Sequence, residues 1–290
     1  MAARIAWVLN LDAELELAVP AHTPSAGVRE ALRTYVPVLA ASLLEEGDVL
    51  VDASSAPGLA RGLAGRAFCP TPRAIALLRR AGAEPEAHPP VEVLRRVSSR
   101  AFCASLGPTL PGAAFVTTWD EARAVLERAP EIGDGWRVKR AFGTSGRGQR
   151  VLRAGAIDVA EEGFVRAGLA RGGVRIEPNV RIETEYAIHG RIGEDGGLRL
   201  GRLVVQRCDT RGAWMSTEPA DAPEIEARLC DEATAVARAL HEAGYFGPFG
   251  IDAFTHRDRE GTLVLQPRSE INARYTMGFA VGFNGRARAP

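Results

Sequence analysis

The sequence has almost no lysine. Of its 36 basic residues only Lys139 is a lysine, and all the others are arginines. The 36 acidic residues balance the basic ones, so no net charge favours nucleic acid or an anionic membrane as a partner. Arginines are interleaved with acids along the chain, a pattern typical of solvated surfaces rather than of a nucleic-acid patch.

Cysteine pairs and long apolar runs are also missing. The cysteines are widely spaced and form no CxxC pair, which argues against a zinc site and a redox dithiol. No segment approaches the roughly 18 apolar residues of a membrane span. The apolar run within residues 1–14 is too short for the core of a signal peptide. We therefore expect a cytoplasmic protein with reduced cysteines.

Strands alternate with helices in the first third of the chain. Strands are expected at 4–9 and 48–52, and helices at 25–44, 56–66 and 72–82. This alternation is typical of a small Rossmann-like α/β unit with a parallel sheet. Within the first helix, Pro37 predicts a kink or a break. The proline-rich run 84–90 predicts a boundary between a domain at 1–89 and a second at 90–290.

The remainder of the chain mixes helices with strands in an α+β pattern. Helices are expected at 90–106, 119–128, 158–171 and 223–243, and strands at 136–140, 150–152, 174–177, 183–188 and 198–206. Glycines at 193–197 favour a long hairpin between the last two strands.

The first candidate site lies in the closing stretch 250–274, GIDAFTHRDREGTLVLQPRSEINAR. The stretch predicts two strands joined by a charged turn. Because side chains alternate along a strand, Glu270, Asn272 and Arg274 should share one face. Carboxylate and amide oxygens suit Mg²⁺, with substrate phosphates completing its coordination. The alternative is an edge strand that is merely polar.

Asp252 can join this metal site only if the hairpin is irregular. With a symmetric turn near Arg259, Asp252 lies opposite Gln266, four positions from Glu270. At roughly 3.3 Å per residue, that separation is too long for the two carboxylates to share a metal. We therefore expect an asymmetric loop or a bulge near Pro267.

A glycine-rich loop forms the second candidate site. Its glycines and hydroxyl residues are Gly143, Thr144, Ser145, Gly146 and Gly148. Backbone N–H groups of such a loop can hold phosphate, although a hairpin loop of this composition can also be only a turn. The Walker pattern is absent, because no Lys-Ser/Thr pair follows the last glycine. Lys139, four residues before the loop, offers a compact charge that suits the phosphates of a nucleotide.

The segment 175–180, RIEPNV, is the third candidate, and Glu183 and Glu185 follow it. Exposed backbone after a strand can read an adenine edge, and a nearby carboxylate can accept hydrogen bonds from ribose hydroxyls. The alternative is that these are surface acids.

The chain resembles the ATP-grasp superfamily over about residues 90–284. The resemblance lies in four motifs in this order: VKRAFGTSGRG, IEPNV with Glu185, GIDAF and EINAR. Members of that superfamily hold ATP between two α+β subdomains. The preceding α/β unit resembles the pre-ATP-grasp domain. By this resemblance, residues of about 131–182 form the flap subdomain and those of about 183–284 form the subdomain that binds the metal.

The resemblance also implies a role for each nucleotide-binding residue. Lys139 would contact the ATP phosphates beneath the mobile flap 143–148. Glu177 and Val180 would form the adenine hinge, and Glu185 would bind the ribose. The family usually has a phosphate-binding lysine in the helix before the flap, where this chain has Arg100 within VSSRAF. Arginine can bind phosphate through two parallel hydrogen bonds, so the grip on the nucleotide can differ.

For the metal, the resemblance implies Asp252, Glu270 and Asn272 as ligands of Mg²⁺, with Mn²⁺ as an alternative. Arg274 would face the γ-phosphate and the acyl-phosphate formed from it. The expected activity is that of an ATP-dependent carboxylate–amine ligase, which forms an amide or peptide bond between small molecules. Two alternatives stay open: a small-molecule kinase, and a regulatory protein that binds nucleotide without turnover. A homodimer is common among similar ligases.

The polar loop 206–214 is expected to border the pocket for the acceptor substrate. Arg207 and Arg211 are candidates for holding substrate carboxylates, and solvated loop arginines are the alternative.

Overall fold

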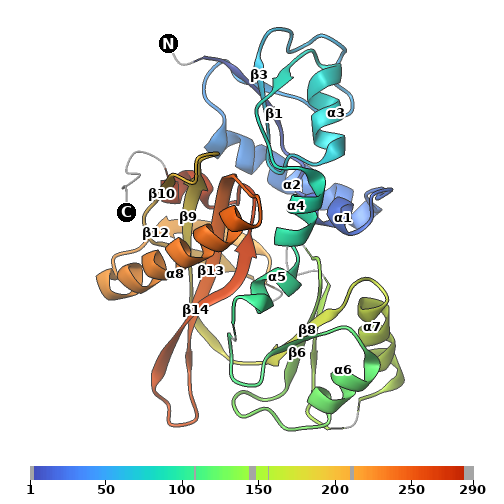
Figure 1. Cartoon of the computed structure of the whole chain (residues 1–290), viewed down its shortest axis with the longest axis vertical. Helices are drawn as coiled ribbons and strands as arrows, with labels where there is room; N and C mark the ends of the chain where they lie inside the picture. The colour runs from blue at the N-terminus through green and yellow to red at the C-terminus, as the bar shows by residue number, and fades with distance from the viewer. Residues whose placement is uncertain (1–2, 108, 144–147, 156, 210–211, 284–290) are drawn as a thin grey trace.

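The computed structural model describes residues 3–107, 109–143, 148–155, 157–209 and 212–283. In these ranges the chain forms three sheets, each covered by helices (Figure 1). The first sheet is parallel, as predicted, with the strand order β2-β1-β3-β4. Its strands are β1 (Ile5–Val8), β2 (Val49–Leu50), β3 (Ala64–Ala67) and β4 (Glu84–Pro85), and the helices of this region are α1 (Ala13–Ala18), α2 (Ala26–Leu43) and α3 (Pro72–Arg80).

One of the helix predictions for this region is wrong. The segment 56–66 forms turns and the start of β3 instead of a helix. Gly58 and Gly62 both have φ near +79°, a left-handed conformation that a right-handed helix cannot contain. At Pro37, where a kink or a break was expected, the helix is not broken, because α2 is one helix through that residue. Pro37 removes one backbone hydrogen bond, while the buried side chain of Leu39 keeps the helix packed on the core.

The second sheet is antiparallel, with the order β5-β8-β6-β7. Its strands are β5 (Ala114–Val116), β6 (Trp136–Arg140), β7 (Gln149–Leu152) and β8 (Val174–Pro178). Helices α6 (Trp119–Leu126) and α7 (Val159–Leu169) pack on it and bury Leu126, Val165 and Ile176 in a common core. Thr118 and Asp158 begin these helices with capping boxes, the first of them at the predicted cap.

The third sheet holds most of the candidate site and has the order β12-β11-β9-β13-β14, with β10 paired to β9. Its strands are β9 (Ile182–Ile192), β10 (Leu198–Leu200), β11 (Val204–Cys208), β12 (Trp214–Pro219), β13 (Gly247–Arg257) and β14 (Leu263–Asn272). Helix α8 (Pro223–Glu242) packs on one face through a core that includes Ile188, Ile251 and Ile271 (Figure 1). The opposite face, with Glu185, Asp252 and Glu270, therefore remains for the site, because side chains alternate along each strand.

Two short helices, α4 (Val91–Val97) and α5 (Arg100–Ser105), replace the single helix expected at 90–106. The break lies at Ser98 and Ser99, where the Ser99 hydroxyl accepts a hydrogen bond from the Ala101 N–H at 3.2 Å and starts α5. Arg100 is thereby the first residue of α5. The last described helix is α9 (Phe279–Phe283).

The domain boundaries at 89/90, 131–182 and 183–284 stay predictions. In the described ranges, none of the helices is long and apolar enough to cross a membrane.

His189 on β9 is a buried histidine whose two ring nitrogens lack hydrogen-bond partners among the described residues. A Cβ atom at Gly282 would come within 2.5 Å of its Nδ1 atom, and one at Gly278 within 3.3 Å of its ring. Glycine at both positions lets α9 and the preceding turn close over the ring. Burial lowers the pKa of His189 to about 4, because the charged ring would lose its hydration.

This shift predicts a pH dependence of stability. Between pH 6.5 and 4 the unfolded chain binds a proton at this histidine and the folded chain does not. The free energy of unfolding should therefore decrease by about 3 kcal/mol when the pH is lowered from 6.5 to 4. His189→Leu should remove that part of the slope in urea titrations at several pH values. The control His241→Leu, at the exposed end of α8, should keep it. An unchanged slope in His189→Leu would contradict the assignment of a neutral buried ring.

Candidate active site

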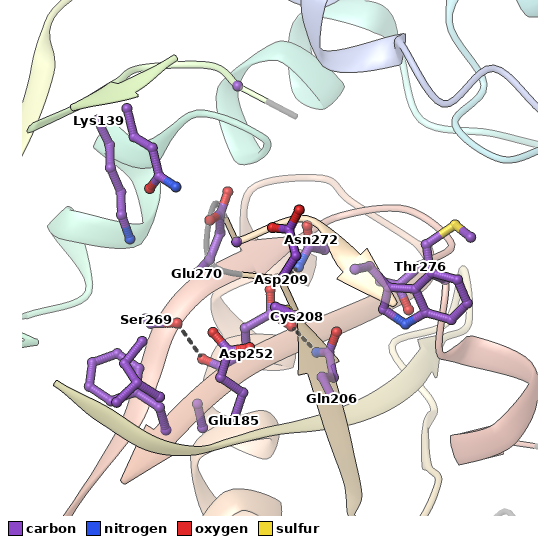
Figure 2. A pocket seen from close by; sticks show the side chains of 18 of the residues that line it. Lys139, Glu185, Gln206, Cys208, Asp209, Asp252, Ser269, Glu270, Asn272 and Thr276 are labelled. Carbon is purple, nitrogen blue, oxygen red and sulfur yellow. Dashed lines mark hydrogen bonds between the residues drawn. The ribbon is translucent and has the colours of Figure 1, made fainter. Parts of the chain in front are cut away.

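A cleft of about 630 Å³ brings the predicted motifs together. It is lined by residues of the second and third sheets and of the N-terminal region (Figure 2). Eleven of the predicted site residues line it: Arg100, Lys139, Gly143, Glu177, Val180, Glu185, Arg207, Asp252, Glu270, Asn272 and Arg274. Thr144, Ser145, Gly146 and Arg211 lie outside the described residues. Gly148 does not line the cleft; its φ of +78° instead turns the chain back into β7.

The hairpin of β13 and β14 has the predicted irregularity. Asp252 pairs directly with Glu270, whereas Phe254 pairs with Gln266. Residues 267–269 thus stand opposite Ala253 alone and form a bulge in β14. Proline cannot donate a hydrogen bond to the neighbouring strand, so Pro267 is accommodated where the pairing is interrupted. The bulge places the two carboxylates on adjacent strands at the same level.

Side chains within and around the bulge hold it in place. Gln266 Nε2 donates to the Arg268 carbonyl at 2.9 Å, and Ser269 Oγ donates to the Asp252 carbonyl at 3.1 Å (Figure 2). The buried Arg268 donates to the carbonyls of Leu106 and Gly107, each at 3.2 Å, and forms an ion pair with Glu232 at 3.2 Å. Contacts with α8 and with the end of α5 therefore fix the register on which the site depends.

Asp252 is partly buried and accepts a hydrogen bond at each oxygen. Gln206 Nε2 lies 2.7 Å from Oδ1, and Asn272 Nδ2 lies 2.8 Å from Oδ2. Burial and the neighbouring charge of Glu270 raise the pKa of Asp252 to about 6. Glu270 is neutralised differently, because its Oε1 atom lies 2.7 Å from Arg100 Nη2. Burial raises the pKa of Glu270, but Arg100 and Lys139 outweigh it and leave the pKa below its ordinary value.

This donor set fits a magnesium ion. The pKa of Asp252 is raised by burial and also by the charge of Glu270, and a cation between the two carboxylates would relieve their repulsion. Asn272 uses its Nδ2 atom toward Asp252, which leaves its amide oxygen for a ligand. In the part of the chain that the structure describes, no three His, Cys, Asp or Glu side chains could hold a metal ion. Substrate phosphates would have to complete the coordination, as is usual for Mg²⁺.

Lys139 belongs to a buried charge group between β6 and β8. It stands directly opposite Arg175, and like charges in that position repel. Glu177 relieves the repulsion: its Oε1 atom lies 2.7 Å from Lys139 Nζ, and its Oε2 atom lies 2.9 Å from Arg175 Nε. Burial raises the pKa of Glu177, but the two cations outweigh it and hold the pKa below its ordinary value. The Glu177 carboxylate therefore holds the Lys139 ammonium at the cleft.

Arg274 differs from its prediction in one respect. Strand β14 ends at Asn272, so Arg274 lies in the following turn rather than on the strand face. It still lines the cleft, where its guanidinium contacts the N-terminal region. Its Nη2 and Nε atoms donate to Glu14 Oε1 at 2.6 and 3.0 Å, and the guanidinium lies over the ring of Phe68 at 5.1 Å. Burial raises the pKa of Glu14.

Glu14 and Phe68 contact Arg274 but were not among the predicted site residues. The signal was the run DAELEL at residues 12–17, in which acids alternate with small or apolar residues; its three acids are all buried. Buried acids require partners, which could have directed attention to this segment. Gln206 was expected at the border of the acceptor pocket, and its hydrogen bond to Asp252 was not foreseen. Glu185, the predicted ribose ligand, lines the cleft beside Cys208 and forms a hydrogen bond with it.

The charge group around Glu177 predicts a large loss of stability on its removal. Glu177→Gln leaves Arg175 and Lys139 buried without a carboxylate, which should lower the free energy of unfolding by roughly 3 kcal/mol. Glu162→Gln is the matched control, because Glu162 pairs with Arg166 at 2.6 Å on the surface of α7 and should change little. Urea titration measures both. Equal stability of the two variants would contradict the role of Glu177 as the counter-charge.

No protein-family model matches this chain. Among curated proteins, the N5-carboxyaminoimidazole ribonucleotide synthase of Vibrio parahaemolyticus is 30% identical over 164 residues. The match covers 54% of this chain, and the chain spans 42% of the length of that relative.

Solved structures match a larger share of the chain. N5-carboxyaminoimidazole synthetase from Staphylococcus aureus, in complex with ADP, has a TM-score of 0.53 at 13% identity and covers 94% of this chain and 71% of its own. Biotin carboxylase from Campylobacter jejuni, in a complex with β-γ-ATP, has a TM-score of 0.56 at 12% identity and covers 98% and 73%. Because these similarities extend over nearly the whole chain and agree with the order of its motifs, we conclude that this chain has the ATP-grasp fold.

Proposed function

We propose that this protein is an ATP-dependent ligase that joins a carboxylate to an amine. One observation carries the proposal: the bulge in β14 places Asp252 directly opposite Glu270, in a cleft that Lys139 and Arg100 also line. Paired carboxylates suit a divalent cation, and the adjacent cations suit the phosphates that such an ion accompanies. The likeness to structures solved with ADP and with β-γ-ATP supports ATP as the nucleotide.

In this proposal each charged group exchanges its present partner for the substrate. Lys139 now pairs with Glu177, and Arg100 with Glu270; both would turn toward the polyphosphate. Glu270, Asn272 and Asp252 would hold Mg²⁺, which supplies charge neutralisation to the phosphates when bound. Val180 and the backbone after Glu177 would hold the adenine, and Glu185 the ribose. Arg100 replaces the lysine usual in this fold and presents two N–H groups in a plane.

The proposed reaction has two steps. A carboxylate oxygen of the substrate attacks the γ-phosphorus, the bond to the β,γ-bridging oxygen breaks, and ADP leaves. Arg274 and Lys139 would stabilise the negative charge on the transferring group. An amine then attacks the acyl carbon, phosphate leaves, and the new amide nitrogen loses a proton to water.

The relatives do not fix the substrates. Those named above are synthases or synthetases of N5-carboxyaminoimidazole compounds and a biotin carboxylase, and the curated match spans less than half of that relative. The identities of the acid and the amine are therefore left to experiment.

Release of ADP tests the proposal. Purified protein with ATP, Mg²⁺ and pooled carboxylic acids and amines should release ADP, and mass spectrometry should find an amide. Glu270→Gln should lower turnover by about 100-fold or more, because one charge at the metal and at the transferring phosphate is lost. The matched control Glu260→Gln, at the exposed tip of the same hairpin, should retain activity.

Other products would identify the alternatives. A phosphorylated alcohol in place of an amide would indicate a kinase. Nucleotide binding without any substrate-stimulated ADP release would indicate a regulatory protein. Hydroxylamine should convert the acyl-phosphate into a hydroxamate, and its absence during active turnover would contradict that intermediate.

A further inference from the structure

Another part of the same cleft is apolar. Figure 2 shows Lys139 and Thr276 on opposite sides of Asn272. Near the Thr276 side, apolar side chains from three separate segments line the cleft: Val28, Ala31, Leu32 and Tyr35 of α2, Trp214 of β12, and Met277. We call these six residues the apolar subsite. The nucleotide and metal residues described above include none of them.

The apolar residues of helix α2 form two groups, one at the main core and one at the cleft. Leu39 in its second half is buried in the main core, and Val36 and Leu43 pack against that core. In its first half, Val28, Leu32 and Tyr35 recur at helical spacing on one side and line the cleft instead. Leu32 and Tyr35 are only partly buried. Apolar surface that lines an open cleft gains free energy when a ligand covers it.

Trp214 presents its ring rather than its polar edge to this space. Its indole N–H donates to Thr217 Oγ1 at 2.8 Å, so the one polar atom of the side chain is already satisfied. The ring stands edge to face with Tyr35, with centroids 6.3 Å apart and planes at 68°. A Cβ atom at Gly278 would lie 2.9 Å from Thr217. The absence of that atom lets β12 approach the turn after β14, so Trp214 and Met277 line the same space.

The neighbouring acids are already paired. Asp12 has Arg73 at 2.6 Å and His22 at 3.3 Å, and Glu14 has Arg274 at 2.6 Å. The side chains of both acids are at most 7% exposed. These pairs disfavour a positively charged side group on the substrate here. Arg274, three residues before Met277, would exchange Glu14 for the substrate carboxylate, as proposed above for the other cations of the cleft.

We propose that the apolar subsite selects a small carboxylic acid, such as an amino acid, that carries a bulky aliphatic or aromatic side group. Its carboxylate reacts beside Arg274, and its side group packs between Leu32, Tyr35, Trp214 and Met277. The inference rests on the proposed ligase function and adds the class of the acid substrate. A bulky apolar group fills space that a short polar group leaves to water, and differences of one or two carbons in such a pocket change kcat/KM by about tenfold or more.

The test measures ADP release by the full chain with ATP, Mg²⁺, an amine pool and single acids. L-phenylalanine, L-leucine and L-tryptophan represent the proposed class, and L-alanine, L-serine and L-glutamate represent short or polar acids. The bulky apolar acids should have kcat/KM values at least about tenfold higher. Equal or better turnover of the short polar acids would overturn the proposal while leaving the ligase function in place.

Variants separate the subsite from the nucleotide site. Leu32→Glu should lower kcat/KM for the bulky apolar acids by about tenfold or more and leave Mg²⁺-dependent ADP binding unchanged. The matched control Val38→Glu changes an exposed residue of the same helix that does not line the cleft, and it should behave as wild type. Trp214→Ala offers a second truncation if Leu32→Glu does not fold. Unchanged selectivity in folded Leu32→Glu and Trp214→Ala would overturn the assignment of the apolar subsite. If the wild-type protein did not bind ADP, the proposed ligase function itself would be overturned.

Discussion

Two carboxylates on neighbouring strands repel each other, and this site depends on how the chain keeps Asp252 and Glu270 side by side. The bulge at 267–269 sets their register. Arg268 anchors that bulge through the carbonyls of Leu106 and Gly107 and through Glu232. Burial and the charge of Glu270 raise the pKa of Asp252 to about 6, and Glu270 forms an ion pair with Arg100. In the proposed function, a bound cation neutralises both carboxylates and takes the place of Arg100 beside Glu270.

The rest of the site follows the same logic of balanced charge. Glu177 holds Lys139, and Glu14 holds Arg274, so each cation expected at the phosphates already has a carboxylate partner. Such pairs keep the cleft folded in the absence of a nucleotide, because an unpaired buried charge costs several kcal/mol. They also place the cations where a polyphosphate can exchange with the carboxylates. The apolar subsite, by contrast, is lined by side chains that suit an apolar group of the substrate rather than a charged one.

The parts of this account that depend on local chemistry were predictable from the sequence. Ser25 and Thr118 cap the predicted helices. Pro267 indicated a bulge in the strand, because proline cannot donate a hydrogen bond to the neighbouring strand. The helix at 56–66 failed because an apolar pattern does not reveal that Gly58 adopts a positive φ. Contacts set by packing between distant segments were not predictable. Glu14 and Arg274 are 260 positions apart, so their pairing depends on how the N-terminal region meets the third sheet.

The central claim is that Asp252, Glu270 and Asn272 form a metal site beside a nucleotide. Crystals grown with ADP and Mn²⁺ test it most directly, because an anomalous difference map locates the manganese without assuming a site. The account predicts a peak bound by Glu270 and Asn272 and adjacent to Asp252, with Lys139 turned from Glu177 toward a phosphate. Nucleotide bound in the cleft with no peak at these side chains, or with Lys139 still paired to Glu177, would contradict it.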